Sequence, residues 1–177
     1  MVQSSSLDRV MDARDHFKNE ASSEKIMLKK ITTAILITFF AWYTLNLTGF
    51  SIGSFVLVIS CFVDEPIDFV GWIIFLIGLI LFIWKNNIGK YFIAIWLMFL
   101  AYIQIAIYLR TPERMESYYN HFANHGTHRL FPVSANFIKD TYHIFIDFFI
   151  LISLVCVICF IIMEFRKNRA KKTRKFL

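Results

Sequence analysis

Long apolar blocks separated by short polar stretches constrain this chain more than any other feature of its sequence. Of its 177 residues, 57% are hydrophobic, well above the roughly 45–50% of a soluble domain. Four of the blocks approach the ~20 residues that an α-helix needs to cross a bilayer. The spans are expected at Ile26–Leu47, Pro66–Trp84, Tyr91–Tyr108 and Tyr142–Phe165. The pattern therefore predicts an all-α integral membrane protein whose membrane domain, residues 26–165, is a bundle of four transmembrane helices.

A fifth apolar block, Ser51–Val63, is too short for a full span, and the distribution of basic residues decides its place. With four spans, fifteen of the 19 Lys and Arg residues lie on one side of the membrane and four on the other. A fifth span would place ten of these basic residues on one side of the membrane and nine on the other. Because basic residues concentrate on the cytoplasmic side, we expect four spans with both termini in the cytoplasm. Ser51–Val63 is then a re-entrant, interfacial or protein-packed segment on the outer side.

The polar segments complete this topology. Residues 1–25 are expected to form a cytoplasmic N-terminal segment, with a short helix against the membrane or the bundle, and residues 166–177 a basic cytoplasmic tail. Lys85–Lys90 is short, polar and basic, as a cytoplasmic turn should be. The net charge of +6 sits at the edges of the apolar blocks. It is therefore interpreted as an orientation signal beside the lipid bilayer and not as a nucleic-acid surface.

The outer loop, residues 109–141, is predicted to contain an amphipathic helix at about 112–125. Thr111 suits an N-cap, Pro112 the first helical position and Gly126 the stop. Its apolar residues recur at helical spacing and form a stripe that must be buried against the bundle, the membrane or a partner. These candidate partner-binding residues are Met115, Tyr118, Tyr119 and Phe122.

Three histidines at the end of this loop helix, His121, His125 and His128, have a spacing that resembles a metal site. Arg114 falls on the same side of the helix, and no carboxylate or cysteine lies close enough in the loop to complete the ligand set. We therefore interpret them as polar surface histidines, with a pH-sensitive outer face as the alternative, and predict no metal and no cofactor.

Polar residues within the spans form a second candidate site. His143 and Asp147 lie four residues apart near the outer end of the fourth span, so they face the same way and can pair. Gln104 and Tyr108 lie at a similar depth in the third span. The four side chains are expected to converge. They would form a hydrogen-bonded clasp between two helices, or a site that handles protons or a ligand, with a metal or haem site as the third alternative.

No catalytic motif accompanies these groups. Cys156 and Cys159 form a C-x-x-C, but it lies within an apolar run that disfavours a thiolate, so we do not expect an enzyme. In length, number of spans and position of both termini, the chain resembles the immunity proteins of pore-forming colicins; no sequence motif is shared, so no residue role is carried over.

The resemblance implies a protein of the bacterial inner membrane that acts by protein–protein interaction. The expected role is immunity-like, exclusion-like or that of a complex subunit, with a membrane-protein partner or a homo-oligomer. The alternative is a proton-coupled transporter or channel component that uses His143, Asp147 and Gln104.

Overall fold

The computed structural model of the chain describes residues 4–60, 66–108, 126–131 and 140–173, and the side chains of 23–60, 68–106, 126–131 and 140–168. Over these residues the protein is mostly helical. The four helices are α1 (Ser4–Thr48), α3 (Pro66–Trp84), α4 (Asn86–Tyr108) and α6 (Thr141–Thr173). A short antiparallel hairpin of β1 (Phe50–Ile52) and β2 (Phe55–Val58) follows α1.

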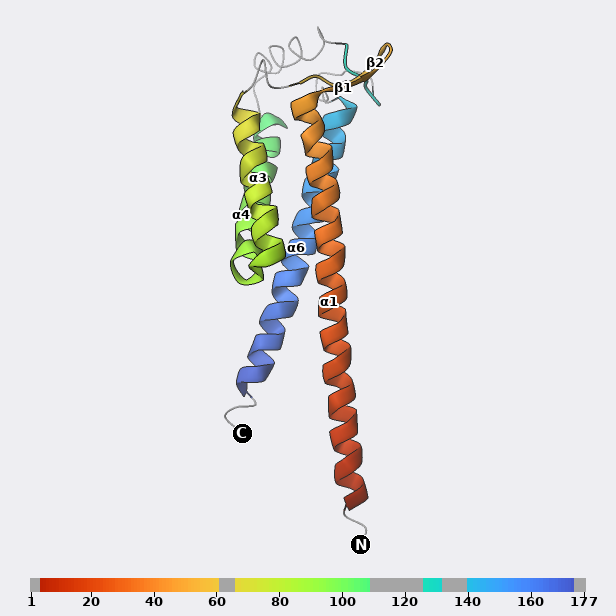
Figure 1. Ribbon diagram of the computed structural model, residues 1–177, viewed down its shortest axis with the longest axis vertical. Helices are drawn as coiled ribbons and strands as arrows, with labels where there is room; N and C mark the ends of the chain where they lie inside the picture. The colour runs from red at the N-terminus through yellow and green to blue at the C-terminus, as the bar shows by residue number, and fades with distance from the viewer. Residues whose placement is uncertain (1–3, 61–65, 109–125, 132–139, 174–177) are drawn as a thin grey trace.

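Three of these helices are long and apolar enough to cross a membrane, within Ser23–Thr48, Asn86–Ala106 and Thr141–Asn168. The fourth apolar helix, α3, is shorter at 19 residues, and its bounds coincide with the predicted second span. The helices run up and down beside one another (Figure 1). The hairpin lies at one end of the bundle, which we call the hairpin end. The tight turn between α3 and α4 lies at the other, which we call the turn end, and both termini extend beyond it.

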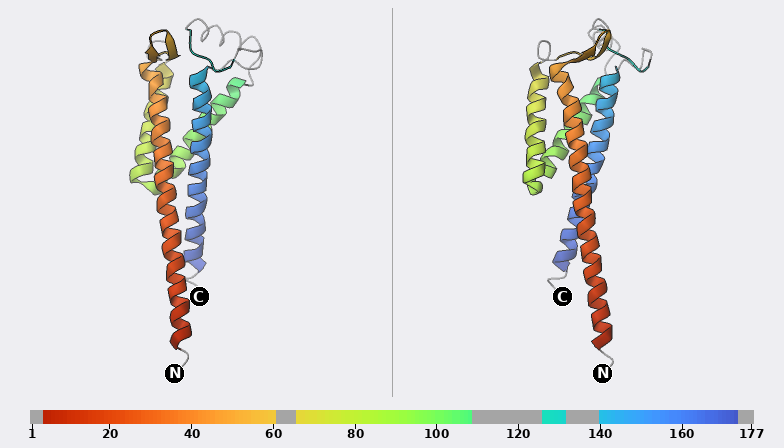
Figure 2. Two further views of the ribbon diagram at one scale, coloured as in Figure 1. Left: turned by 90° about the vertical axis from the view of Figure 1, so that its right-hand side faces the viewer. Right: turned by 45° about the vertical axis from the view of Figure 1, so that its right-hand side comes forward.

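Aromatic and aliphatic side chains fill the centre of the bundle. Phe39 of α1 is fully buried and contacts Phe75 of α3 edge to face, with ring centroids 4.9 Å apart. It also stacks on Phe149 of α6 at 5.8 Å. Figure 2 shows α4 crossing obliquely between α3 and α6, where the buried side chains of Ile93 and Leu97 contribute to the same core. All four helices therefore share one apolar core.

The termini of the helices differ from the sequence predictions. The short helix expected within the N-terminal segment, 1–25, is part of α1, which runs without a break from Ser4 to Thr48; the cytoplasmic location of this segment stays a prediction. The expected basic tail is helical through Thr173 as part of α6. The apolar pattern locates the part of a helix that can lie in the membrane. The helix itself continues into polar sequence until a helix-ending residue such as Gly or Pro. Neither Gly nor Pro occurs at these two junctions.

The predicted turn Lys85–Lys90 is much tighter than expected. Helix α3 ends at Trp84 and α4 begins at Asn86, so only Lys85 lies between them. Its backbone carbonyl accepts hydrogen bonds from the N–H groups of Ile88 and Gly89. A Cβ atom on Gly89 would lie 2.2 Å from the backbone carbon of Leu81. Only glycine lets α4 start this close to the end of α3.

The block Ser51–Val63 is not helical where the structure describes it, so the all-α expectation is wrong over residues 50–58. Strands β1 and β2 pair with Ser51 opposite Val56 and Ile52 opposite Phe55. Gly53 supplies the positive φ of 58° that the tight turn requires. A short apolar run rich in Phe, Val and Ile suits a strand as well as a buried segment, and periodicity alone does not separate the two.

Candidate functional site

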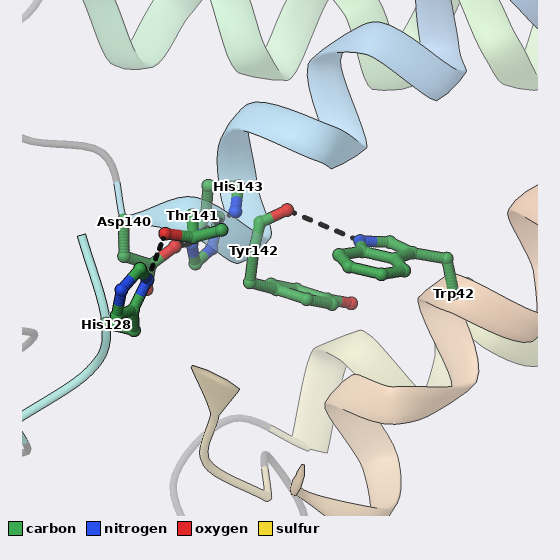
Figure 3. Close-up of polar contacts among 6 residues, drawn as sticks. All are labelled: Trp42, His128, Asp140, Thr141, Tyr142 and His143. Carbon is green, nitrogen blue, oxygen red and sulfur yellow. Dashed lines mark hydrogen bonds and ion pairs between the residues drawn. The ribbon is translucent and has the colours of Figure 1, made fainter. Parts of the chain in front are cut away.

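The hairpin end carries a cluster of polar contacts that begins at Asp140, the residue before α6. The Asp140 carboxylate caps the helix, because its Oδ1 accepts a hydrogen bond of 2.9 Å from the backbone N–H of His143. The same oxygen lies 2.7 Å from Nδ1 of the His143 ring. Figure 3 shows both residues at the start of α6.

Asp140 is 2% exposed, yet its surroundings favour the charged form. Burial raises the pKa of the carboxyl group. The hydrogen bond and charge of the His143 ring, the backbone N–H of His143 and the side chain of Thr127 lower it, and together they outweigh burial. The net effect holds the Asp140 pKa below its usual value of 3.8, so this buried group is a carboxylate at neutral pH.

His128 links this helix start to the hairpin. Its ring Nδ1 lies 2.9 Å from Oγ1 of Thr141 (Figure 3), and its backbone carbonyl accepts from the Thr141 N–H at 3.0 Å. In the other direction, the His128 N–H donates to the carbonyl of Val56 in β2 at 2.6 Å, and its ring packs on Phe55 with centroids 4.8 Å apart. The hairpin and residues 126–131 are therefore connected to each other and to the start of α6, and we call the hairpin with residues 126–131 the cap.

A second set of contacts fastens α1 to α6 beneath this cap. The indole N–H of Trp42 donates to the Tyr142 carbonyl at 3.4 Å (Figure 3), and the two rings stack at 5.8 Å. The Tyr142 side chain is fully buried, and its hydroxyl donates to the Tyr43 carbonyl. These contacts hold the first turn of α6 against α1, so the capped helix start is packed on α1.

Helix α1 is also fastened to α3 at this end. The Asn46 side-chain amide donates to Asp68 Oδ2 at 2.7 Å, and the Trp72 indole donates to the Thr44 hydroxyl at 2.9 Å. A Cβ atom on Gly71 would lie 2.9 Å from the Tyr43 hydroxyl oxygen, so a glycine at this position permits the close approach of the two helices. The polar contacts of the hairpin end thus connect three helices and the cap.

The predicted cluster of Gln104, Tyr108, His143 and Asp147 is placed only in part. His143 and Asp147 lie one turn apart on α6 and are both half-buried, and Gln104 of α4 is half-buried too. The side chain of Tyr108 lies outside the described residues. The structure adds a partner that the sequence analysis did not name, since the His143 ring pairs with Asp140. The convergence of the four predicted residues stays a prediction.

The other predicted sites fall mostly outside the described part of the chain. The loop helix at 112–125, with Met115, Tyr118, Tyr119 and Phe122, lies there, as do His121 and His125. His128 is described and contacts Thr141 and Phe55. Among the described residues, no group of three or more His, Cys, Asp or Glu side chains is arranged to hold a metal ion.

The described contacts of the cap hold segments of the fold together. A nucleophile triad would place a carboxylate behind the histidine that contacts the hydroxyl. Here His128 contacts the Thr141 hydroxyl, whereas Asp140 pairs with the other histidine, His143. The His128–Thr141 pair joins residues 126–131 to α6, whereas the Asp140–His143 pair lies within the start of α6. Among the described residues, the two pairs do not make the order required for acyl transfer.

The turn end contains a buried ion cluster that is absent from the sequence predictions. Glu164 of α6 accepts from Lys25 of α1 at 2.6 Å and from Lys90 of α4. Glu164 and Lys90 are each only 6% exposed. The available signal was Glu164 itself, an acidic residue at the end of a long apolar run, because a buried carboxylate requires a cationic partner. In the sequence, Lys90 indicates only a basic turn and the orientation of the chain.

No protein-family model matches this chain, and comparisons with curated proteins and with solved structures found no match.

Proposed function

We propose that this chain is a small four-span membrane protein with both termini in the cytoplasm that acts by binding another membrane protein. The proposed location is the inner membrane of a bacterium.

The length of α3 supports four spans. Its 19 residues rise about 28 Å at 1.5 Å per residue, close to the ~30 Å of a bilayer's hydrocarbon core. Helices α3 and α4 are antiparallel neighbours joined at Lys85, so if α4 crosses the membrane α3 must lie alongside it. The two termini and the α3–α4 turn lie at the same end of the molecule (Figure 1), in keeping with an even number of crossings.

The outward faces of the helices support insertion into lipid. On α4, exposed apolar side chains recur along one face at helical spacing, with Ile95 64% and Ile105 57% exposed. Such a face is costly in water and suits hydrocarbon. Similar apolar faces occur on α3 and α6, for example at Ile77 and Leu151.

Exposed apolar side chains on the cap carry the proposal of protein binding. Ile52 at the hairpin turn is 68% exposed, and Leu130 and Phe131 in the adjoining segment are 51% and 55% exposed. These residues lie beyond the ends of the helices, on a cap that the contacts of His128 connect to β2 and α6. Exposed apolar residues gathered on a folded segment are typical of a docking surface.

The test is site-specific photo-crosslinking in living cells. A photoreactive amino acid at Ile52 or Leu130 should give one discrete crosslinked product with a membrane protein. The matched control is Ile95, which at 64% is nearly as exposed as Ile52 but lies on the side of α4. The proposal also predicts that Phe131→Ala, and Tyr119→Ala with Phe122→Ala in the loop, lower the yield of the partner that co-purifies in mild detergent.

Two outcomes contradict the proposal. A partner yield that none of the cap or loop changes alters would show that the cap is not the docking surface. A pure homo-oligomer with no second protein would favour the alternative, a proton-coupled transporter or channel component that uses His143, Asp147 and Gln104.

A further inference from the structure

Lysine side chains gather around the α3–α4 turn at the turn end of the bundle. Lys25 and Lys29 lie one turn apart on α1, so they share a face. Lys25 reaches the Glu164 that also holds Lys90 of α4. The Lys29 ammonium lies 3.4 Å from the backbone carbonyl of Ile83, in the last turn of α3. The face of α1 that carries both lysines is therefore turned toward α6 and the α3–α4 turn.

The positive charge of this region is not balanced. Residues 24–30, 85–90 and 164–167 contain seven Lys and Arg residues and two Glu residues. Glu164 offsets one charge of the pair Lys25 and Lys90. The hydrogen bond of Lys29 runs to a neutral carbonyl, and Lys85 in the turn is exposed. An ammonium group has three N–H donors, so Lys29 and Lys85 each retain donors that can bind an anion.

Two aromatic residues beside the turn place this charge at a membrane boundary. Trp84, the last residue of α3, is 82% exposed, and Tyr91 is 51% exposed with the Lys90 ammonium 4.9 Å from its ring centre. Exposed Trp and Tyr with Lys at helix ends are typical of the headgroup region. The far end of α3, about 28 Å away by helical rise, belongs to the opposite boundary.

We propose that the turn end binds the phosphate of an anionic phospholipid of the cytoplasmic leaflet. Lys29 and Lys85 donate hydrogen bonds to the phosphate, while Trp84 lies against the lipid chain below it. Positive charge at the level of the headgroups complements this ligand. An acidic protein segment would also satisfy the charge, but it does not account for exposed Trp84 and Tyr91 beside it. This inference rests on the proposed four-span arrangement.

The test uses the full chain purified in a mild detergent and native mass spectrometry with added lipid. Phosphatidylglycerol and phosphatidylcholine of identical chains serve as probes, because only the first has a net negative headgroup. The wild-type protein should retain phosphatidylglycerol in preference. The variant Lys29→Gln with Lys85→Gln should lose most of that preference, about fivefold for each lysine. Neither residue belongs to the Glu164 ion cluster, so we expect the variant to fold.

The matched control is Lys30→Gln with Lys167→Gln, which removes two positive charges from the same end of the bundle. Lys30 is exposed and lies about 100° around α1 from Lys29. The control should keep the preference. An equal loss in both double variants, or no preference in the wild type, would overturn the inference.

Two further arms separate the possible causes of a failure. Glycerol 3-phosphate at millimolar concentration should not displace the lipid, and displacement would mean that the site takes free phosphate and overturn the lipid assignment. Retention of phosphatidylcholine by the wild type reports a lipid-embedded surface. A chain that retained neither lipid would overturn the membrane proposal itself, whereas one that retained both equally would overturn only the anionic site.

Discussion

At the scale of single residues, two buried carboxylates organise the two ends of the molecule. Asp140 is 2% exposed and caps α6 while it pairs with His143. Glu164 is 6% exposed and joins α6 to α1 and α4 through two lysines. A buried carboxylate is tolerated only when its partners replace the water that it has lost. Each is therefore expected to be costly to remove.

Replacing Asp140 should separate its capping role from its charge. Asp140→Ala removes the cap and should lower the free energy of unfolding by about 1 kcal/mol or more, whereas Asp140→Asn keeps a capping side chain and should cost less. The measurement is denaturant-induced unfolding of the purified protein in detergent micelles, followed by circular dichroism.

The effect of pH on these variants follows from the lowered pKa of Asp140. A lowered pKa in the folded state means that the carboxylate stabilises the fold fully above its usual value of 3.8 and loses this effect as the pH falls through the folded value. The difference between wild type and Asp140→Asn should therefore shrink below about pH 4. A difference that grew in acid would contradict this assignment.

Substitutions of Glu164 and of Lys90 are expected to lower the free energy of unfolding by different amounts. Glu164→Leu leaves two lysines without their carboxylate, and removal of one partner of a buried pair costs about 3–5 kcal/mol. Lys90→Met should cost less, because Glu164 keeps its 2.6 Å contact with Lys25. The same unfolding assay compares the two. An equal or larger loss in Lys90→Met would show that Glu164 does not act as the common acceptor.

At the scale of elements, helices α3 and α4 pack closely against each other across a very short turn. The two helices are separated by one residue, Lys85, and Gly89 lies against the backbone of Leu81 and Phe82. Gly78 makes a second close approach, since a Cβ atom there would lie 3.0 Å from side-chain atoms of Phe92 and Ile93. The close packing of α3 on α4 therefore depends on Gly78 and Gly89, and the apolar pattern of the two helices does not reveal this.

Gly89→Ala should open this turn. The added methyl group would lie 2.2 Å from a backbone carbon, so α4 must shift, at a cost of about 1–3 kcal/mol or more. Asn87→Ala, an exposed change in the same turn of α4, is the control and should be nearly neutral. Thermal unfolding in detergent, followed by circular dichroism, measures both. Equal stability of the two variants would mean that the turn is looser than described.

At the scale of the whole molecule, both termini lie beyond the turn end, opposite the hairpin (Figure 2). If the four helices cross the membrane, the hairpin and the two termini lie on opposite sides of it, and the proposed orientation places the hairpin outside. The end that holds residues 24–30, 85–90 and 164–167 is also the one with the excess of basic residues, which agrees with the positive-inside rule.

Cysteine labelling of intact cells tests this orientation. In a chain whose three natural cysteines are replaced, Ser54→Cys in the hairpin turn should react with a membrane-impermeant maleimide. Lys175→Cys should react only after the cells are permeabilised. Labelling of Lys175→Cys from outside would contradict the four-span arrangement and the outward-facing cap together.

The sequence by itself was sufficient for the apolar helices. The bounds of α3 agree with the predicted span Pro66–Trp84, and the other three predicted spans lie within α1, α4 and α6. This succeeds because the length and composition of an apolar helix are local properties. The same local reasoning places His143 and Asp147 on one face of α6, but it does not reveal that the His143 ring pairs with Asp140.

Only the tertiary structure decided what each polar residue contacts. Lys25 and Glu164 are 139 residues apart in the chain, and Trp42 and Tyr142 are 100 apart. No periodicity links such residues, because their contact depends on how the helices pack. The hairpin at 50–58 was missed for a related reason. Its short apolar strands gain stability from pairing and from the contact of His128 with Val56, and neither is visible in the residues of the block alone.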